Sequence, residues 1–292
     1  ALKVIDLHSH YSTRRGYLFQ SAEEIALQEK TWGHRTGYRT DEEMVQDFRD
    51  AGAAVFLDFG FTLRKSVSLA QMRELHDYAG ELIARHPDVI LGGWISIDPS
   101  HGKEGLREYE RCLRDLKMVG LLMNPAMINI APTDPLYEGF YEISAEARAP
   151  VLIAVGYTVE GAGLPGGGGN ILEYNHPRYV DEVAAKHPDL TIIAGRQAWP
   201  WVNEMIAVLL HKPNVWHELH GWSPKYFTRE LKWEISHRLK NKVLFGADYP
   251  LLGYERLIRD WESEGYSEEI LQRVYHRNAR ALFRALGRDL PV

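Results

Sequence analysis

The sequence is poor in three features, and each absence excludes a class of protein. It has one cysteine, Cys112, so no disulfide framework can form, which fits the reducing cytoplasm. It has no apolar run of the roughly 18 residues that a membrane-spanning helix needs. The formal net charge is −6 at pH 7, whereas a nucleic-acid-binding protein needs a basic surface. We therefore expect no membrane and no nucleic acid as partner, and the strand-like start "ALKVIDLHSH" shows no signal peptide.

Short apolar runs recur along the chain and indicate parallel strands covered on both faces. They lie at residues 4–8, 53–59, 89–97, 119–123, 151–155, 190–194, 214–219 and 242–247. Amphipathic stretches such as "DEEMVQDFRDAG" and "WVNEMIAVLLHK" separate them. Strands that alternate with helices in this number predict an α/β protein with a (β/α)8 barrel, formed by residues 1–292 as a single domain.

Two long connections are expected at the carboxyl ends of strands, where barrel active sites form. One spans about 9–40, and the other spans 156–170 with the string "GYTVEGAGLPGGGGN". The glycines of the second would permit a mobile lid over the site.

The first strand ends in "DLHSH", which places His8 and His10 two residues apart. Side chains at i and i+2 project to the same side of a strand, so both imidazoles would point at one spot, as a metal pair or an acid–base pair requires. Asp248 follows the eighth strand in "VLFGADYP" and would face the same mouth, as a metal ligand or a general base for water. The alternatives are two surface histidines and a helix N-cap at Asp248.

The strings "IDLHSH", "GYT", "PWVNEMI", "KPNVWHELHGWSPKYF" and "VLFGADYP" resemble the amidohydrolase-related family. That family includes aminocarboxymuconate semialdehyde decarboxylase, resorcylate-type decarboxylases and related hydratases and hydrolases. The resemblance runs over nearly the whole chain and implies a distorted (β/α)8 barrel, often dimeric. It also implies a divalent metal, zinc or manganese, with His8, His10 and Asp248 as the matching ligands.

The chain departs from the family pattern where further metal ligands are expected. The positions that end the fifth and sixth strands, which hold histidine in the family, are Ala154 and Gly195, and neither residue has a donor atom. Asn124, after the fourth strand, is neutral where relatives often carry a charged residue or an imidazole, and we count it among the substrate-binding residues. We expect no tightly bound metal.

Glu218 and His220, in "HELHGW", end the seventh strand at i and i+2. They could replace the missing ligands, form a separate acid–base pair, or make a structural hydrogen bond at the rim. Arg196 directly follows Gly195 and could supply part of a metal's electrostatic role, by polarising a carbonyl or holding an anion; the alternative is a salt bridge.

Further candidates would bind a carboxylated substrate through cations and aromatic rings. The cations are Arg14, Arg15 and Lys225, and the aromatic residues are Tyr157, Trp199 and Trp222. The alternatives are solvated loops and ordinary packing.

These observations favour a hydrolase with little or no metal dependence, acting on a small carboxylated, unsaturated or ring-containing substrate. Asp248 would be the general base, His8 and His10 would orient water or protonate the leaving group, and Arg196 would hold an anion. One alternative is a carboxy-lyase or hydratase of an aromatic or muconate-type acid. The other is a catalytically degenerate barrel that binds a ligand.

Overall fold

The computed structural model describes residues 1–17, 21–33, 37–59 and 67–292. Eight parallel strands pair in sequence order, from the first to the eighth. The strands are β1 (Val4–His10), β2 (Ala53–Asp58), β3 (Ile90–Ile95), β4 (Gly120–Met123), β5 (Val151–Ala154), β6 (Ile192–Gly195), β7 (Val215–Glu218) and β8 (Val243–Leu244). Backbone hydrogen bonds join β1 to the segment after β8, from Leu7 N to Phe245 O at 2.9 Å and from Asp248 N to His8 O at 3.0 Å. The predicted (β/α)8 barrel is confirmed.

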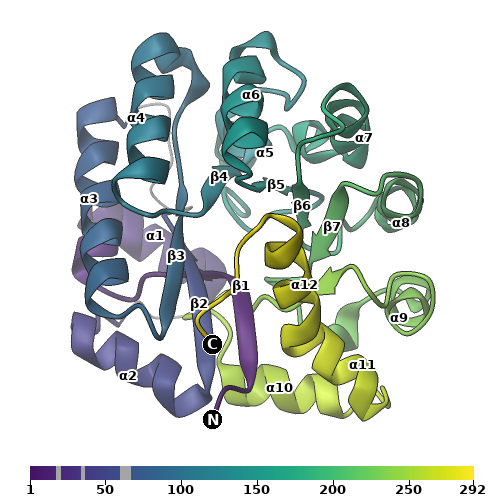
Figure 1. Ribbon diagram of the computed structural model, residues 1–292. Helices are drawn as coiled ribbons and strands as arrows, with labels where there is room; N and C mark the ends of the chain where they lie inside the picture. The colour runs from purple at the N-terminus through teal and green to yellow at the C-terminus, as the bar shows by residue number, and fades with distance from the viewer. Residues whose placement is uncertain (18–20, 34–36, 60–66) are drawn as a thin grey trace.

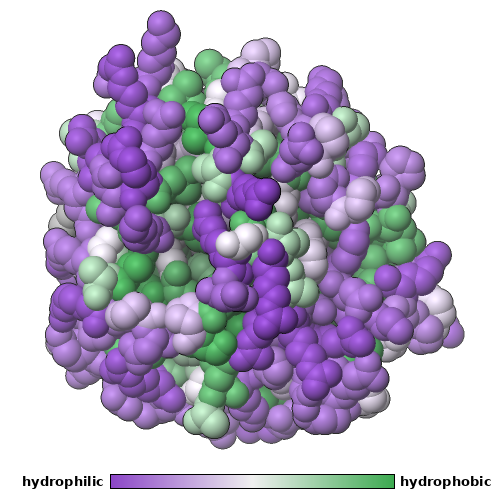
Figure 2. All heavy atoms as spheres, in the orientation of Figure 1, coloured by the Kyte–Doolittle hydropathy of each residue, from purple (hydrophilic) through white to green (hydrophobic). Residues whose placement is uncertain are grey.

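Helices surround the strands as an outer ring, with α12 lying across the end of the barrel that faces the viewer in Figure 1. The helices are α1 (Ala22–Trp32), α2 (Asp41–Ala51), α3 (Leu69–Arg85), α4 (Gly102–Arg114), α5 (Pro125–Ile128), α6 (Glu138–Ala147), α7 (Pro177–Lys186), α8 (Val202–His211), α9 (Arg229–Ile235), α10 (Tyr254–Glu262), α11 (Glu268–Gln272) and α12 (Asn278–Ala285). None of the helices in the described ranges is long and apolar enough to cross a membrane. Hydrophilic side chains cover most of the face seen in Figure 2, with apolar atoms in separate patches between them.

Two clusters of apolar side chains form the core. The larger lies between the strands and the outer helices. The smaller lies inside the barrel, where Leu7, Leu152 and Ile193 meet Leu282 and Phe283 of α12. α12 covers part of this end, and because the strands are parallel, their carboxyl ends with the polar residues lie together at the opposite one, the mouth.

The structure corrects the long connection expected at 9–40. β1 continues through His10, and α1 forms within the segment; residues 18–20 and 34–36 lie outside the described ranges. Polar residues surround most of α1, in the sequence "AEEIALQEKTW", so hydrophobic periodicity could not reveal it.

Candidate active site

His8 and His10 lie side by side at the carboxyl end of β1. The β1–β2 register shifts between Asp6 and Ser9. The two imidazole rings are buried, and their centroids are 4.9 Å apart in an edge-on arrangement. The predicted pair therefore forms, at the mouth of the barrel.

Two carboxylates hold these imidazoles. Asp58, which ends β2, contacts Nε2 of His8 through Oδ2, and its Oδ1 lies 2.7 Å from Nδ1 of His10. Asp248 presents Oδ1 at 2.7 Å from Nε2 of His10 and at 3.9 Å from Nδ1 of His8. His10 is thus fixed between two carboxylates, and Asp58 bridges both histidines.

Burial and nearby charges shift the pKa values of these groups in different directions. Burial alone would lower the pKa of His10, but the charges of Asp58 and Asp248 and their hydrogen bonds raise it to about 10. Burial lowers the pKa of His8 to about 4, against the attraction of Asp58. Burial opposes ionisation of Asp248, yet the hydrogen bond from His10 and nearby positive charge bring its pKa below the usual value. Asp248 is therefore a carboxylate at neutral pH, as a general base must be.

Glu218 and His220 form a second buried pair beside His8. Oε2 of Glu218 lies 2.6 Å from Nδ1 of His220, and the backbone N–H of His220 donates to Oε1. The rings of His220 and His8 have centroids 3.6 Å apart. Burial raises the pKa of Glu218 well above its usual range and lowers that of His220 well below its own, so both favour the neutral form.

Arg196 directs its guanidinium group toward the mouth. A Cβ built on Gly221 would lie 3.4 Å from Oδ2 of Asp248 and 4.0 Å from Nε of Arg196, so both side chains border this exposed glycine. Nη1 of Arg196 is buried without a hydrogen-bond partner in the described part of the chain. The cation is therefore available to an anion beside Asp248.

The backbone near the mouth adopts conformations that cost free energy. Arg196, Ala198 and Asp248 have φ angles of 75°, 69° and 65° although none of them is glycine. Such residues gather at functional sites, where the surrounding structure holds them in place.

Glu160, on the connection after β5, brings another carboxyl group to the mouth. Burial raises its pKa to about 7, although the positive charges of Arg196 and His10 act in the opposite direction. The Thr158 hydroxyl accepts from the Glu160 N–H at 3.2 Å and donates to Oε2 at 3.4 Å. Asn170 donates to the Glu160 carbonyl at 2.9 Å, so the connection is built to hold this residue.

Three aromatic side chains form a cluster after β5, β6 and β7. Tyr157 lies 6.0 Å from Trp199 and 6.4 Å from Trp222, and the two tryptophans are 6.3 Å apart, measured between ring centroids. Trp199 is 47% exposed, so the cluster has a free apolar face. The structure thus brings together the three aromatic residues that the sequence indicated.

The other predicted substrate-binding residues are placed differently. Arg15 pairs with Glu81 of α3 at 2.9 Å, and Lys225 pairs with Asp260 of α10 at 2.9 Å. Arg14 is exposed and lies over the ring of Tyr38. Asn124 is buried directly after β4. The ion pairs hold Arg15 and Lys225 against outer helices, so they do not join Arg196.

Two overlapping groups at the mouth have the composition and spacing to hold a metal ion. One is His8, His10 and Asp248, and the other is His8, Glu218 and His220. Nδ1 of His8 and Nε2 of His220 are buried nitrogen atoms without a hydrogen-bond partner among the described residues. Imidazole and carboxylate donors with unused nitrogen atoms fit a divalent cation.

Asp58 and Glu160 are the residues of this site that sequence reasoning missed. Asp58 is a carboxylate that ends an apolar strand, the signal that identified Asp248, so the pattern could have found it. Glu160 lies in a glycine-rich connection with no periodicity, and nothing local placed it at the mouth.

Comparisons with known proteins agree with this architecture. A family model described as Amidohydrolase matches residues 5–285. Among solved structures, an uncharacterized TIM-barrel protein from Bordetella bronchiseptica is 20% identical with a TM-score of 0.77, covering 98% of this chain and 100% of that one. A 2,6-dihydroxybenzoate decarboxylase from Rhizobium is 16% identical with a TM-score of 0.70, covering 98% and 99%.

A dihydroxybenzoic acid decarboxylase from Polaromonas, with bound manganese and an inhibitor, is 18% identical with a TM-score of 0.68 and covers 99% and 98%. At these identities the solved structures show a shared fold. No curated protein matches the chain.

Proposed function

Since the chain belongs to the amidohydrolase family, we propose that it hydrolyses a small carboxylated, unsaturated or ring-containing substrate at the barrel mouth. One observation carries the proposal. The carboxylate of Asp248 and the guanidinium of Arg196 border the same exposed position, Gly221. A base and an anion-binding cation thereby face one volume that substrate can enter.

Asp248 is the general base in this scheme. It is ionised at neutral pH and receives a hydrogen bond from His10, which Asp58 holds from the other side. A water molecule bound to Oδ2 of Asp248 would lose its proton to this carboxylate as it attacks the substrate carbonyl carbon. Asp58 acts through His10 and is a positioning residue.

Arg196 binds the substrate carboxylate or the oxyanion that develops at the carbonyl. Its buried Nη1 is a donor without a partner in the described structure, so an anion would satisfy it. Charge-assisted hydrogen bonds of this kind are stronger than neutral ones, and a preorganised donor stabilises developing charge most effectively in a site that excludes water.

Glu160 supplies the proton for the leaving group. A carboxyl group with a pKa of about 7 is protonated in a substantial fraction of molecules at neutral pH. A catalytic acid works best when its pKa lies near the operating pH. The Tyr157–Trp199–Trp222 cluster offers an apolar wall to a flat substrate.

A divalent cation, if bound by His8, His10 and Asp248, would supply Lewis-acid polarisation and lower the pKa of bound water. We propose weak metal dependence or none, because Ala154 and Gly195, where the family pattern has histidine, have no donor atom to complete the site. Metal analysis of protein purified without chelator tests this directly. Stoichiometric zinc or manganese would contradict metal independence and leave the assignments of Arg196 and Glu160 intact.

Decarboxylation of an aromatic acid is the second candidate, favoured by the decarboxylases among structures of the same fold and by the aromatic cluster. Arg196 would hold the carboxylate, the carbon–carbon bond would break with loss of CO2, and Glu160 would protonate the ring carbon.

Product analysis separates the two reactions. Carboxylated lactones and dihydroxybenzoates are incubated in ¹⁸O-labelled water, and released CO2 and label in the acid product are measured. Hydrolysis places one ¹⁸O atom in a new carboxylate, whereas decarboxylation releases CO2 and adds a solvent proton to carbon.

The Asp248→Asn substitution tests the common assignment. Loss of a general base costs roughly 10²–10⁴-fold in rate. Unchanged turnover of a substrate found in this way would remove Asp248 from the mechanism. Asp289→Asn is the matched control. Asp289 pairs with Arg284 near the C-terminus, at the end of the barrel opposite the mouth.

A further inference from the structure

A cavity of about 370 Å³ opens at the end of the barrel opposite the mouth. Its walls come from β2, β3, α4 and α12, from residues 117–119 just before β4, and from residues 288–291. Ligand-binding cavities have volumes of roughly 300–1,000 Å³. This one is large enough for a small organic molecule and shares no residue with the candidate active site.

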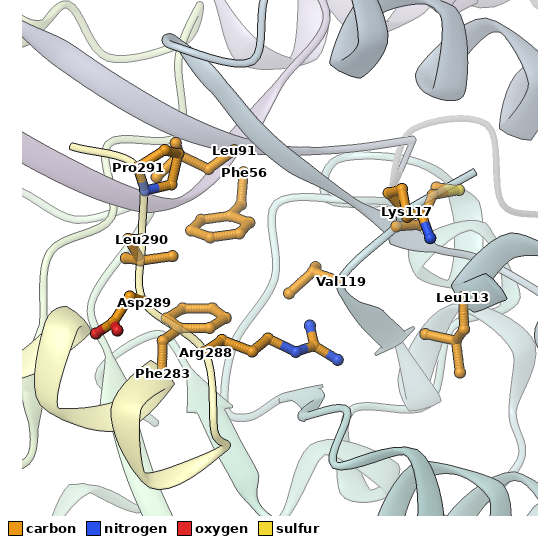
Figure 3. A pocket seen from close by; sticks show the side chains of 11 residues that line it. Phe56, Leu91, Leu113, Lys117, Val119, Phe283, Arg288, Asp289, Leu290 and Pro291 are labelled. Carbon is orange, nitrogen blue, oxygen red and sulfur yellow. The ribbon is translucent and has the colours of Figure 1, made fainter. Parts of the chain in front are cut away.

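The floor of the cavity is apolar and rigid. The rings of Phe56 and Phe283 stack with centroids 5.0 Å apart and an interplanar angle of 3°. Val119 and Leu290 add aliphatic surface, and Figure 3 shows all four around the opening. Phe56 and Phe283 belong to the cluster that fills the barrel interior, so packing on both sides fixes their positions.

Two cations line the cavity. Arg288 extends its guanidinium away from the Phe56–Phe283 pair, toward the side where Lys117 and Leu113 lie (Figure 3). Neither Arg288 nor Lys117 forms an ion pair with a carboxylate in the part of the chain that the structure describes. Burial lowers the pKa of Arg288, which a carboxylate partner would oppose.

The acidic residue of the lining does not neutralise them. Asp289 pairs with Arg284 of α12 at 3.4 Å, and its carboxylate points away from the guanidinium of Arg288 in Figure 3. The cavity therefore combines an apolar floor with two cations that form no ion pair in the described part of the chain.

We propose that this cavity is a second binding site, which takes a small organic anion: a carboxylate joined to an aliphatic or aromatic body. The body would lie against the partly exposed Leu91, Leu113 and Leu290, with the buried Phe56–Phe283 pair behind them, and the carboxylate would bind Arg288 and Lys117. A few convergent polar groups in an apolar cavity are the usual composition of such sites, and guanidinium binds carboxylate with two parallel hydrogen bonds.

A bound anion would also stabilise the fold. Arg288 and Leu290 belong to the segment that follows α12, and Arg280 of α12 donates to the carbonyl of Val292 at 3.1 Å. A ligand that joins Arg288 to Lys117, just before β4, would tie this segment to the barrel. Because such a ligand binds only the folded chain, it would raise the thermal unfolding temperature.

Octanoate is the probe, and isothermal titration calorimetry measures its affinity. The titration uses the Arg196→Met background, in which the cation at the mouth is absent and catalysis is not needed. We expect one site, with affinity at least 10-fold weaker in Arg288→Met, because that variant loses the charge-assisted hydrogen bonds to the carboxylate. Lys117→Met should also weaken binding, and octanol should bind less tightly than octanoate.

Arg107→Met is the matched control, because Arg107 of α4 pairs with Glu104 at the surface and does not line the cavity. It should bind octanoate with unchanged affinity. Val119→Phe, which fills the cavity, should abolish binding, and its unfolding temperature shows whether it folds. Octanoate binding that is absent, or equal in Arg288→Met and Arg107→Met, would overturn the proposal, whatever the reaction at the mouth.

Discussion

His220 occupies the space above Gly195. A Cβ built on Gly195 would lie 3.2 Å from Cε1 of His220, 3.4 Å from Oε2 of Glu218 and 3.0 Å from Cδ2 of Leu152. The position where the family resemblance implies a histidine is thus covered by an imidazole that comes from the next strand. The space that a histidine side chain at position 195 would occupy is filled by the Glu218–His220 pair.

A methyl group at position 246 should disrupt this pair far more than one at position 195. A Cβ on Gly246 would come within 1.7 Å of Oε1 of Glu218 and 2.9 Å of Cβ of His220. We expect Gly246→Ala to destabilise the protein by about 1–3 kcal/mol and Gly195→Ala by less, as overpacking predicts. Chemical denaturation measures both, and equal effects would show that Glu218 is free to move.

Removal of the Arg196 guanidinium should weaken substrate binding. Arg196→Met should lower kcat/KM by roughly 10–100-fold, the value of one or two charge-assisted hydrogen bonds. Arg15→Met is the matched control and should leave kcat/KM unchanged, because Arg15 pairs with Glu81 at the surface. A larger loss in the Arg15 variant would restore Arg15 as the substrate cation in place of Arg196.

Glu160 should produce a falling activity at alkaline pH. Arg196, His10, Asp58 and Asp248 act on this carboxyl group electrostatically, and burial sets its pKa at about 7. A general acid must be protonated, so kcat/KM should be highest below pH 7 and decline as pH rises through this value.

In Glu160→Gln the rate should drop, and the decline near pH 7 should disappear. Glu173→Gln is the matched control, since Glu173 forms an exposed ion pair with Arg178. A decline that persists unchanged in Glu160→Gln would assign it to another group and remove the proposed role of Glu160.

Local sequence patterns were enough to predict the fold and part of the candidate site. Apolar runs identified the eight strands, and His8, His10 and Asp248 were predictable because each lies at, or a few residues after, the carboxyl end of a strand. Glu160 was not, since its position depends on contacts of its connection with distant residues. One of these is Asn129, whose Nδ2 donates to Gly169 O at 2.8 Å.

The same limit applies to the cations. Arg15 and Arg196 look equivalent as basic residues after strands, and only the three-dimensional structure separates them. Glu81 of α3 forms an ion pair with Arg15, whereas no residue of the described chain accepts a hydrogen bond from Nη1 of Arg196. Partners that lie far apart in sequence decide which charge is free.

A buried carboxylate between α3 and α4 should contribute to stability without affecting the active site. Glu108 accepts hydrogen bonds from Arg111 at 2.8 Å, from His76 at 3.0 Å and from Cys112 at 3.3 Å. His76, Glu108 and Cys112 could by type and spacing hold a metal. However, Nε2 of His76 already accepts from Ser96 N–H, so these contacts form a satisfied structural network.

Glu108→Gln should lower the free energy of unfolding by about 1–3 kcal/mol at pH 7, because a buried network loses its charge. Burial opposes ionisation of Glu108, but Arg111 and His76 outweigh it and lower its pKa from 4.5 to about 2. The folded state therefore binds fewer protons than the unfolded state between these pKa values, and the stabilisation from Glu108 is lost as pH falls through this range.

The difference in the free energy of unfolding between wild type and Glu108→Gln, measured by urea unfolding, should narrow from pH 5 to pH 3. Glu104→Gln removes an exposed pair with Arg107 on the same helix and should cost less than about 0.5 kcal/mol at either pH. Equal costs for the two variants would show that burial adds nothing at Glu108.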